Sequence, residues 1–169
     1  DSGSMFIPGQ YLNYPVWSLV AIHIERFGTS FSGRKKRVLN SLRSTLDFYT
    51  PLSPRYAFSS SFGEKASGSL NLISVPSIFY GSSIKKGSVS LKFYVSGTLI
   101  AEVQDKNYNG DLIQVSGTTY AQTNGENKVA GSVLYNEGFI ILTGSWALES
   151  TSRDYLGTGS PVTSSWIYF

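Results

Sequence analysis

Apolar and polar residues alternate most regularly within residues 74–148, and this pattern predicts an antiparallel β core. Four apolar residues at every second position share one face of an extended segment: Val89, Leu91, Phe93 and Val95. A second apolar run, residues 98–103, is followed by Asn109-Gly110 and then by residues 112–115. Because Asn-Gly accepts the positive φ angles of a tight turn, we expect the chain to reverse there.

A second hairpin is predicted between residues 132–135 and 139–143. The connection Asn136-Glu137-Gly138 ends in glycine, which suits a turn that closes in the left-handed region. Residues 116–127 and 149–160 are polar, and we expect an exposed loop at each.

The chain before the core is predicted to contain one or two helices. Pro15 can begin a helix, and apolar residues then recur at helical spacing up to Gly28: Trp17, Val20, Ile24 and Phe27. A buried strand is the alternative, because Val20, Ile22 and Ile24 also alternate; we prefer the helix.

The second predicted helix, residues 34–49, has a clear apolar stripe and ends before Pro51. The stripe comprises Val38, Leu39, Leu42 and Leu46. The basic run Arg34-Lys35-Lys36-Arg37 is expected to lie away from it. Its positive charges lie at the N-terminal end of the helix, where they interact unfavourably with the helix dipole. We therefore expect an acidic neighbour or a phosphate to compensate.

Together these patterns predict a mainly β protein with an antiparallel, β-sandwich-like core, an N-terminal arm and one or two helices. The division is an extended arm over residues 1–14, a helical segment over 15–54, the core over 55–148, and a loop and terminal strand over 149–169. The bare aromatic end, residues 165–169, is typical of a strand cut in its middle, so we expect a segment of a longer polypeptide.

Composition narrows the function classes. The 169 residues are 41% hydrophobic and 15% charged, which favours a strand-rich structural or binding protein over disorder. The absence of cysteine excludes disulfides and thiolate metal sites. A net charge of +3 does not indicate a bulk nucleic-acid-binding surface. No apolar run approaches the roughly 20 residues of a membrane helix, so no membrane partner is expected.

Residues 105–110 match the opening of a calcium-binding loop, with oxygen-bearing side chains at alternate positions and then glycine. Ser116 stands where the bidentate glutamate should be, which argues against an EF-hand. Another calcium site would use Asp105, Asn107, Asn109 and Asp111. We favour a hairpin loop whose side chains cap their own backbone, and we predict no metal and no cofactor.

Other candidate residues have simple structural interpretations. The basic run at residues 34–37 is predicted to be a solvated face or a contact for an acidic partner or an anion, with nucleic acid unlikely. His23, the single histidine, is expected to be a partly buried packing residue, and no catalytic constellation is apparent. Three tryptophans would suit a protein interface or a sugar-binding platform: Trp17, Trp146 and Trp166.

Several segments resemble long virion structural proteins of large tailed bacteriophages of marine bacteria. In the core these are SVPSIFYGSSIKKGSVSLKFYVSGTLIAEVQD, NGDLIQV and VAGSVLYNEGFIILTG, followed by the terminal SWIYF. NYPVWSLVAIHIERFG and RKKRVLNSLRSTLDFY are similar to what precedes that core in such proteins. The resemblance implies a particle component, in the neck, tail, baseplate or head surface, and supplies no catalytic residues.

We therefore expect a structural virion subunit that is not an enzyme and acts through contacts with other virion proteins and with copies of itself. The alternative is a carbohydrate- or receptor-binding β module, with a host-surface glycan as its partner. A glycan hydrolase ranks below both. The fold rather than sequence spacing brings its paired carboxylates together, and with only eleven acidic residues nothing in the sequence favours them.

Overall fold

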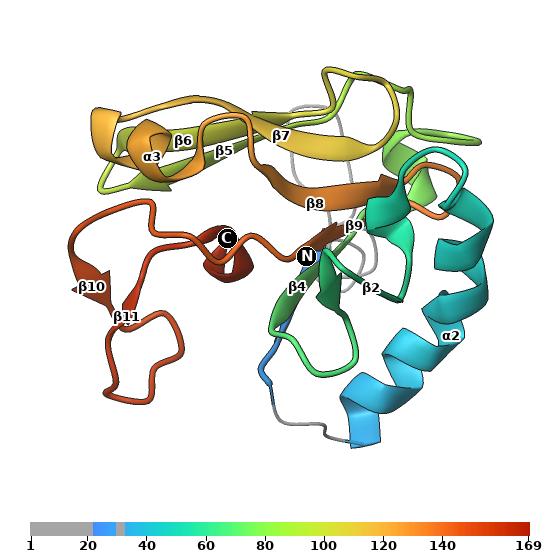
Figure 1. The fold of residues 1–169 in the computed structure, drawn as a ribbon, viewed down its shortest axis with the longest axis horizontal. Coiled ribbons are helices and arrows are strands. Elements are labelled where there is room, and N and C mark those ends of the chain that lie inside the picture. The colour runs from blue at the N-terminus through green and yellow to red at the C-terminus, as the bar shows by residue number, and fades with distance from the viewer. Residues whose placement is uncertain (1–21, 30–32) are drawn as a thin grey trace, which may run out of the picture.

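The computed structural model describes residues 22–29 and 33–169 and contains one large antiparallel sheet (Figure 1). Its strand order is β1-β4-β9-β8-β7-β6-β5. The strands are β1 (His23–Phe27), β4 (Leu70–Ser74), β5 (Ser90–Val95), β6 (Thr98–Gln104), β7 (Asp111–Gly117), β8 (Val129–Leu134) and β9 (Phe139–Leu142). The predicted mainly β, antiparallel class is confirmed.

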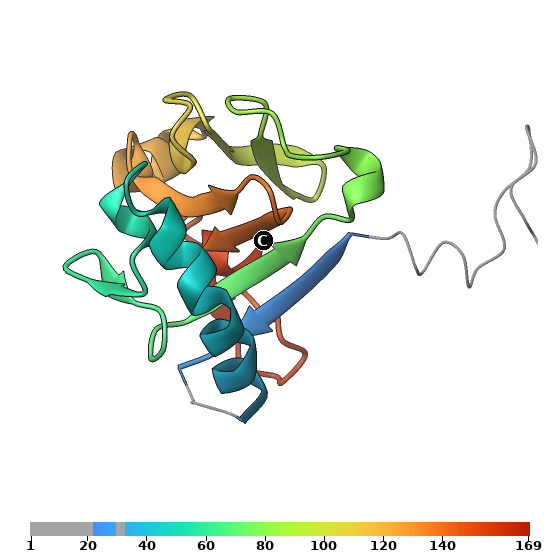
Figure 2. The same ribbon diagram turned by 90° about the vertical axis from the view of Figure 1, so that its right-hand side faces the viewer.

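The sheet curls strongly along its length (Figures 1 and 2). Register shifts occur between each pair of strands from β5 to β8: at Phe93/Tyr94, at Glu102/Val103 and at Leu112/Ile113. An extra residue on one strand bends the ladder and increases its twist. The half formed by β5, β6 and β7 therefore turns over the half formed by β8, β9, β4 and β1, which gives the sandwich-like shape.

The strands β4, β8 and β9 are covered on both faces. Helix α2 (Gly33–Tyr49) lies on one side of them, and the C-terminal 3-10 helix η3 (Trp166–Tyr168) lies on the other (Figures 1 and 2). Every residue of β8 after Val129 and every residue of β9 after Phe139 is buried. Burial on two faces explains why β9 is a continuous apolar run, and it also places the polar Asn71 of β4 and Ser132 of β8 inside the protein.

Short elements complete the described chain: η1 (Pro54–Tyr56), β2 (Ser59–Ser60), β3 (Gly63–Glu64), η2 (Ser77–Phe79), α3 (Thr119–Gly125), β10 (Ser152–Arg153) and β11 (Val162–Thr163). Strands β2 and β3 form a small hairpin, as do β10 and β11. Helix α2 is the helix predicted over residues 34–49, and its residues Leu39, Leu42 and Leu46 are buried. Among the described helices, none is both long and apolar enough to span a membrane.

The helix preferred for the chain before Gly28 is wrong where it can be tested. Residues 23–27 form strand β1, whose Ile24 pairs with Ile73 of β4. Pairing with a strand distant in sequence decides this segment. The alternative of a strand is correct, but the strand is not buried as expected, because Ile22 and Ile24 are exposed. The predicted arm over residues 1–14, Pro15 and Trp17 lie outside the described residues.

Two predictions for polar and terminal segments are also wrong. Residues 116–127, expected to be a loop, contain α3, whose start is capped by Thr118 accepting a hydrogen bond from the Ala121 amide at 3.2 Å. Residues 165–169, expected to be a strand, contain η3 (Trp166–Tyr168), and Trp166 is fully buried there. Packing of one aromatic side chain, rather than strand propensity, sets this conformation.

Both predicted hairpins form, but the first turn differs in detail. Positive φ angles fall on Tyr108 (59°) and Gly110 (89°), so the Asn-Gly pair does not act as a two-residue turn. The connection from Gln104 to Asp111 is longer because Asp105 organises it, as described below. In the second hairpin Gly138 has φ 75°, as predicted for the end of that turn.

Candidate functional site

The candidate calcium residues form a loop centred on the buried carboxylate of Asp105. Its Oδ2 accepts hydrogen bonds from the Gly87 amide at 2.8 Å and from the Tyr135 hydroxyl, and its Oδ1 accepts one from the Gly110 amide at 3.0 Å. A side chain at Gly110 would collide with the Tyr56 hydroxyl, and its φ is positive, so glycine is required there. Asp105 thus holds two loops and a tyrosine together.

The other residues of this loop do not converge on a common centre. Asn109 caps the backbone as predicted, since its Oδ1 accepts from the Asp111 amide at 3.2 Å. Asp111 is buried and accepts from the Ser53 hydroxyl at 3.0 Å. Asn107 is exposed. Within residues 22–29 and 33–169, no group of three or more His, Cys, Asp or Glu side chains could hold a metal ion.

Three tyrosines join α2, η1 and the sheet around Asp105. The Tyr49 ring stacks on Tyr56 at a centroid distance of 5.2 Å and lies 6.5 Å from Tyr135. Burial raises the pKa of Tyr135, and its hydrogen bond to Asp105 raises it further. Burial and then the Asp105 charge raise the pKa of Tyr56. Both phenols therefore stay protonated and act as donors, Tyr56 to the Val133 carbonyl.

The basic run on α2 is divided between different contacts. Arg34 forms an ion pair with Glu25 of β1, Nε to Oε1 at 2.6 Å, which supplies the acidic neighbour expected for this helix end. Lys35 was expected to lie away from the core but is buried, and its Nζ donates to the Gly28 and Gly68 carbonyls at 2.7 Å each. Lys36 and Arg37 are exposed. The predicted interface or anion contact can therefore involve Arg34, Lys36 and Arg37, but not Lys35.

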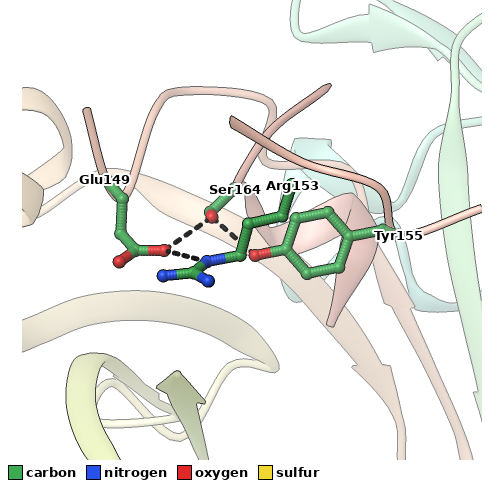
Figure 3. A network of polar contacts seen from close by, with 4 residues as sticks. All are labelled: Glu149, Arg153, Tyr155 and Ser164. Atoms are coloured by element: carbon green, nitrogen blue, oxygen red, sulfur yellow. Dashed lines mark hydrogen bonds and ion pairs between the residues drawn. The ribbon is translucent and has the colours of Figure 1, made fainter. Parts of the chain in front are cut away.

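A second polar network ties the C-terminal segment to itself (Figure 3). Oε2 of Glu149 accepts from Arg153 Nε at 3.2 Å and from the Ser164 hydroxyl at 2.9 Å. The Tyr155 and Ser164 hydroxyls share a hydrogen bond of 2.6 Å. Tyr155 also stacks on Tyr168 at 5.5 Å. These contacts fix the β10–β11 hairpin against the residues that lead into η3.

The aromatic residues singled out in the sequence are mostly internal. Trp166 is fully buried and meets the Phe93 ring at 5.9 Å, edge to face, and Trp146 is half-buried. Both indole N–H groups donate to Oε1 of the buried Gln114, at 3.0 and 2.9 Å. These two tryptophans therefore do not form a surface platform. His23 is exposed on β1, contrary to the partly buried position expected.

A cleft of about 380 Å³ lies between the β2–β3 hairpin and strands β4, β8 and β9. Its walls combine hydroxyl groups with apolar side chains, and Arg55 stacks over the Phe62 ring at 4.2 Å on its rim. Lys65 lines the cleft although it is almost fully buried. Its Nζ donates to the Arg55 and Ala57 carbonyls at 2.8 and 2.6 Å.

Lys65 should make stability depend on pH. Burial lowers its pKa from 10.5 to about 8, with Glu64 opposing the change. Between these values the folded state binds fewer protons than the unfolded state, so the free energy of unfolding rises with pH. Relative to Lys65→Met, the native chain should gain about 2 kcal/mol between about pH 7.5 and about pH 9.5 in urea unfolding experiments.

The control for this prediction is Lys106→Met, which removes an exposed lysine. It should keep the pH dependence of the native chain. If Lys65→Met kept that dependence as well, Lys65 would not be the titrating group.

Sequence inspection missed Lys35, Lys65 and Gln114 as internal polar centres. Nothing in their neighbourhood marks them, since lysine and glutamine are usually exposed and their partners are backbone carbonyls or residues distant in sequence. Asp105 was noticed as a calcium candidate or a side chain that caps its own turn, because aspartate before a glycine-containing turn has a recognisable pattern, but its burial was not predicted.

Comparison of the chain with protein-family models, with curated proteins and with solved structures finds no match.

Proposed function

We propose that this chain is a structural subunit that holds its place through protein–protein contacts, and that it belongs to the virion of a tailed bacteriophage. The virion part of the proposal rests on the sequence resemblance described above. The interaction part rests on one observation, the exposure of large apolar side chains at one end of the sheet.

That end is defined by the register of four strands. His23 pairs with Ser74, Ser74 with Phe139, and Phe139 with Leu134, so β1, β4, β9 and β8 all meet there. The large side chains exposed near it are Ile22 (53%), Ile24 (48%), Ile78 (72%) and Phe79 (58%). We call these four residues the apolar end. Several exposed large apolar side chains in one region favour a contact surface over a free one.

The edge of the sheet beside the apolar end adds a second mode of contact. Strand β1 is the last strand in the order, so its outer edge has no partner strand among the described residues. Unpaired backbone groups on such an edge can accept a strand from another chain. Ile24 lies on this strand, so apolar contact and backbone pairing could act together.

The apolar end predicts a measurable change in assembly. Replacing Ile78 and Phe79 together by serine should raise the apparent dissociation constant of self-association roughly hundredfold, because each exposed anchor contributes about 1–2 kcal/mol. Light scattering over a concentration series measures this. Tyr94→Ser, on β5 at the other edge of the sheet, is the control and should leave assembly unchanged.

A native chain that stays monomeric at high concentration would contradict self-association. The virion part has its own test, which is detection of the chain by mass spectrometry in purified particles of the phage that encodes it.

A second candidate function, glycan or receptor binding, is favoured by the cleft beside Lys65. Hydroxyl groups of Ser132, Thr143 and Ser145 line it, and Phe62 offers an exposed ring at its rim. Aromatic faces with nearby hydroxyls suit sugars. Glycan-array binding that is lost in Phe62→Ser would favour this function, and no binding would exclude it.

A further inference from the structure

A groove distinct from the cleft opens between the C-terminal end of α2 and the chain before β5. It has a volume of about 610 Å³. Tyr49, Leu52, Ile84 and Tyr135 provide its apolar and aromatic lining, and Phe48 on its edge is 74% exposed. Such an apolar concavity next to an exposed aromatic side chain is the usual form of a binding site for a peptide segment.

The rim of this groove is basic. Lys85 and Lys86 both line it and are exposed, and the Lys86 ammonium lies 5.7 Å from the centre of the Tyr135 ring. An occupant with basic side chains would be repelled here, whereas an apolar segment without basic residues would not.

The chain contains a segment with this composition. Residues 1–21 include many apolar side chains and no lysine or arginine, and Asp1 carries their single charged side chain. Its large apolar residues include Leu12, Tyr14, Val16 and Trp17, and Leu19 and Val20 lie closest to the described chain. Tryptophan and tyrosine are the residues that most often anchor a segment in an apolar groove.

The point of attachment brings this segment to the groove. Residue 21 joins Ile22, immediately before β1, at the apolar end of the sheet. Leu134 of β8 lies level with His23 across the sheet, three strands away from it. Tyr135 and Asn136, which line the groove, follow Leu134 directly in the sequence. Three strand spacings are about 15 Å. Roughly five residues span that distance, which places Val16 and Trp17 within reach of the groove.

We propose that the groove bounded by Phe48, Lys85 and Tyr135 binds the N-terminal segment of this chain, with Trp17 as its main anchor. This inference does not depend on the proposed function, because a segment bound in its own groove is compatible with a monomer. A segment bound in the groove of a neighbouring copy would in addition link subunits of an assembly.

The absence of cysteine allows a direct test with the full chain. Val16→Cys combined with Lys85→Cys should form a disulfide under mild oxidation roughly tenfold faster than Val16→Cys combined with Lys128→Cys. Lys128 is a matched control: it is also an exposed lysine, but it precedes β8 at the end of that strand opposite to Leu134. Equal rates for the two pairs would overturn the proposal.

Non-reducing gel electrophoresis separates the two forms of binding. A monomer of altered mobility means that the segment occupies its own groove, and a disulfide-linked dimer means that it occupies a neighbour's. Either product supports the proposal when it exceeds the control.

A second set of variants tests whether the disulfide forms through binding in the groove or through random collision of the two cysteines. Adding Phe48→Ser to the Val16/Lys85 pair should reduce the rate to that of the control, because the groove loses its aromatic edge. Adding Phe62→Ser, which alters an exposed phenylalanine at the other cleft, should not. Phe48 and Phe62 are both exposed, so neither change should prevent folding. A rate that is insensitive to Phe48→Ser would overturn the proposal.

Discussion

Replacing Asp105 by alanine is expected to lower the free energy of unfolding by about 4 kcal/mol. The carboxylate is fully buried and accepts from the Gly87 amide, the Gly110 amide and the Tyr135 hydroxyl. Alanine would leave the buried Gly110 amide and Tyr135 hydroxyl without an acceptor, and it would also remove the partly buried bond from Gly87. Urea unfolding followed by circular dichroism measures the loss.

The asparagine variant refines this prediction. Asp105→Asn keeps the shape and one acceptor oxygen, but its amide nitrogen is a donor that would face another donor. We expect a loss of about 2–3 kcal/mol, less than that of the alanine variant. If both variants cost the same, the loss of the carboxylate acceptors alone, and not the side-chain volume, would account for the effect, whereas a loss confined to the alanine variant would make the volume responsible.

Asp154 provides a matched control for Asp105. It too accepts from backbone amides of its own loop, those of Leu156, Thr158 and Gly159, and these bonds lower the pKa of its carboxyl. It is exposed, so water can replace the lost acceptor. Asp154→Ala should therefore change global stability little. A loss equal to that of Asp105→Ala would mean that burial is not what makes the Asp105 contacts important.

The two aspartates also illustrate what the sequence could predict. The loop around Asp105 was recognised as a turn with self-capping side chains, because the positions of Asp, Asn and Gly are a local signal. That Asp105 also reaches Gly87 and Tyr135 was not predictable, since those partners are 18 and 30 residues away. The self-capping turn of this loop was predictable from the sequence, and the contacts with distant residues that hold it in place were not.

The same distinction explains which strands were predicted. Strands β5 and β6 lie at one edge of the sheet. In β5 polar and apolar residues alternate along the sequence, because its side chains point in turn toward solvent and toward the interior. Residues 23–27 fitted both a helix and a strand until β4 provided a partner. The short helix α3 was hidden by its polar composition, and its position depends on Gln114, whose side chain donates to the Ala121 carbonyl at 2.8 Å.

Gln114 carries the second large prediction: Gln114→Ala should lower the free energy of unfolding by about 3–5 kcal/mol. This fully buried side chain on β7 accepts from the Trp146 and Trp166 indoles and donates to Ala121 and Gln122. It therefore joins the sheet to α3 on one hand and to the C-terminal segment on the other. Removing it takes the acceptor from both indoles and the donor from Ala121 and Gln122, and it also leaves a cavity.

Two comparisons separate the hydrogen bonds from the packing. Trp166→Phe keeps an aromatic ring beside Phe93 but removes one donor to Gln114, so it should cost clearly less than Gln114→Ala. Gln104→Ala, on the neighbouring strand β6, removes a half-buried glutamine that bonds to Glu102 and should have a small effect. Urea unfolding measures all three variants.

The spectroscopic consequence of Gln114→Ala is specific to this arrangement. Both tryptophans of the described chain donate to the same oxygen, so its removal should weaken the near-ultraviolet circular dichroism of the folded state before global unfolding occurs. If the near-ultraviolet spectrum and the stability both stayed at native values, the indoles would have found other acceptors. The C-terminal segment would then be held by the stacking of Trp166 on Phe169 and its edge-to-face contact with Phe93 rather than by Gln114.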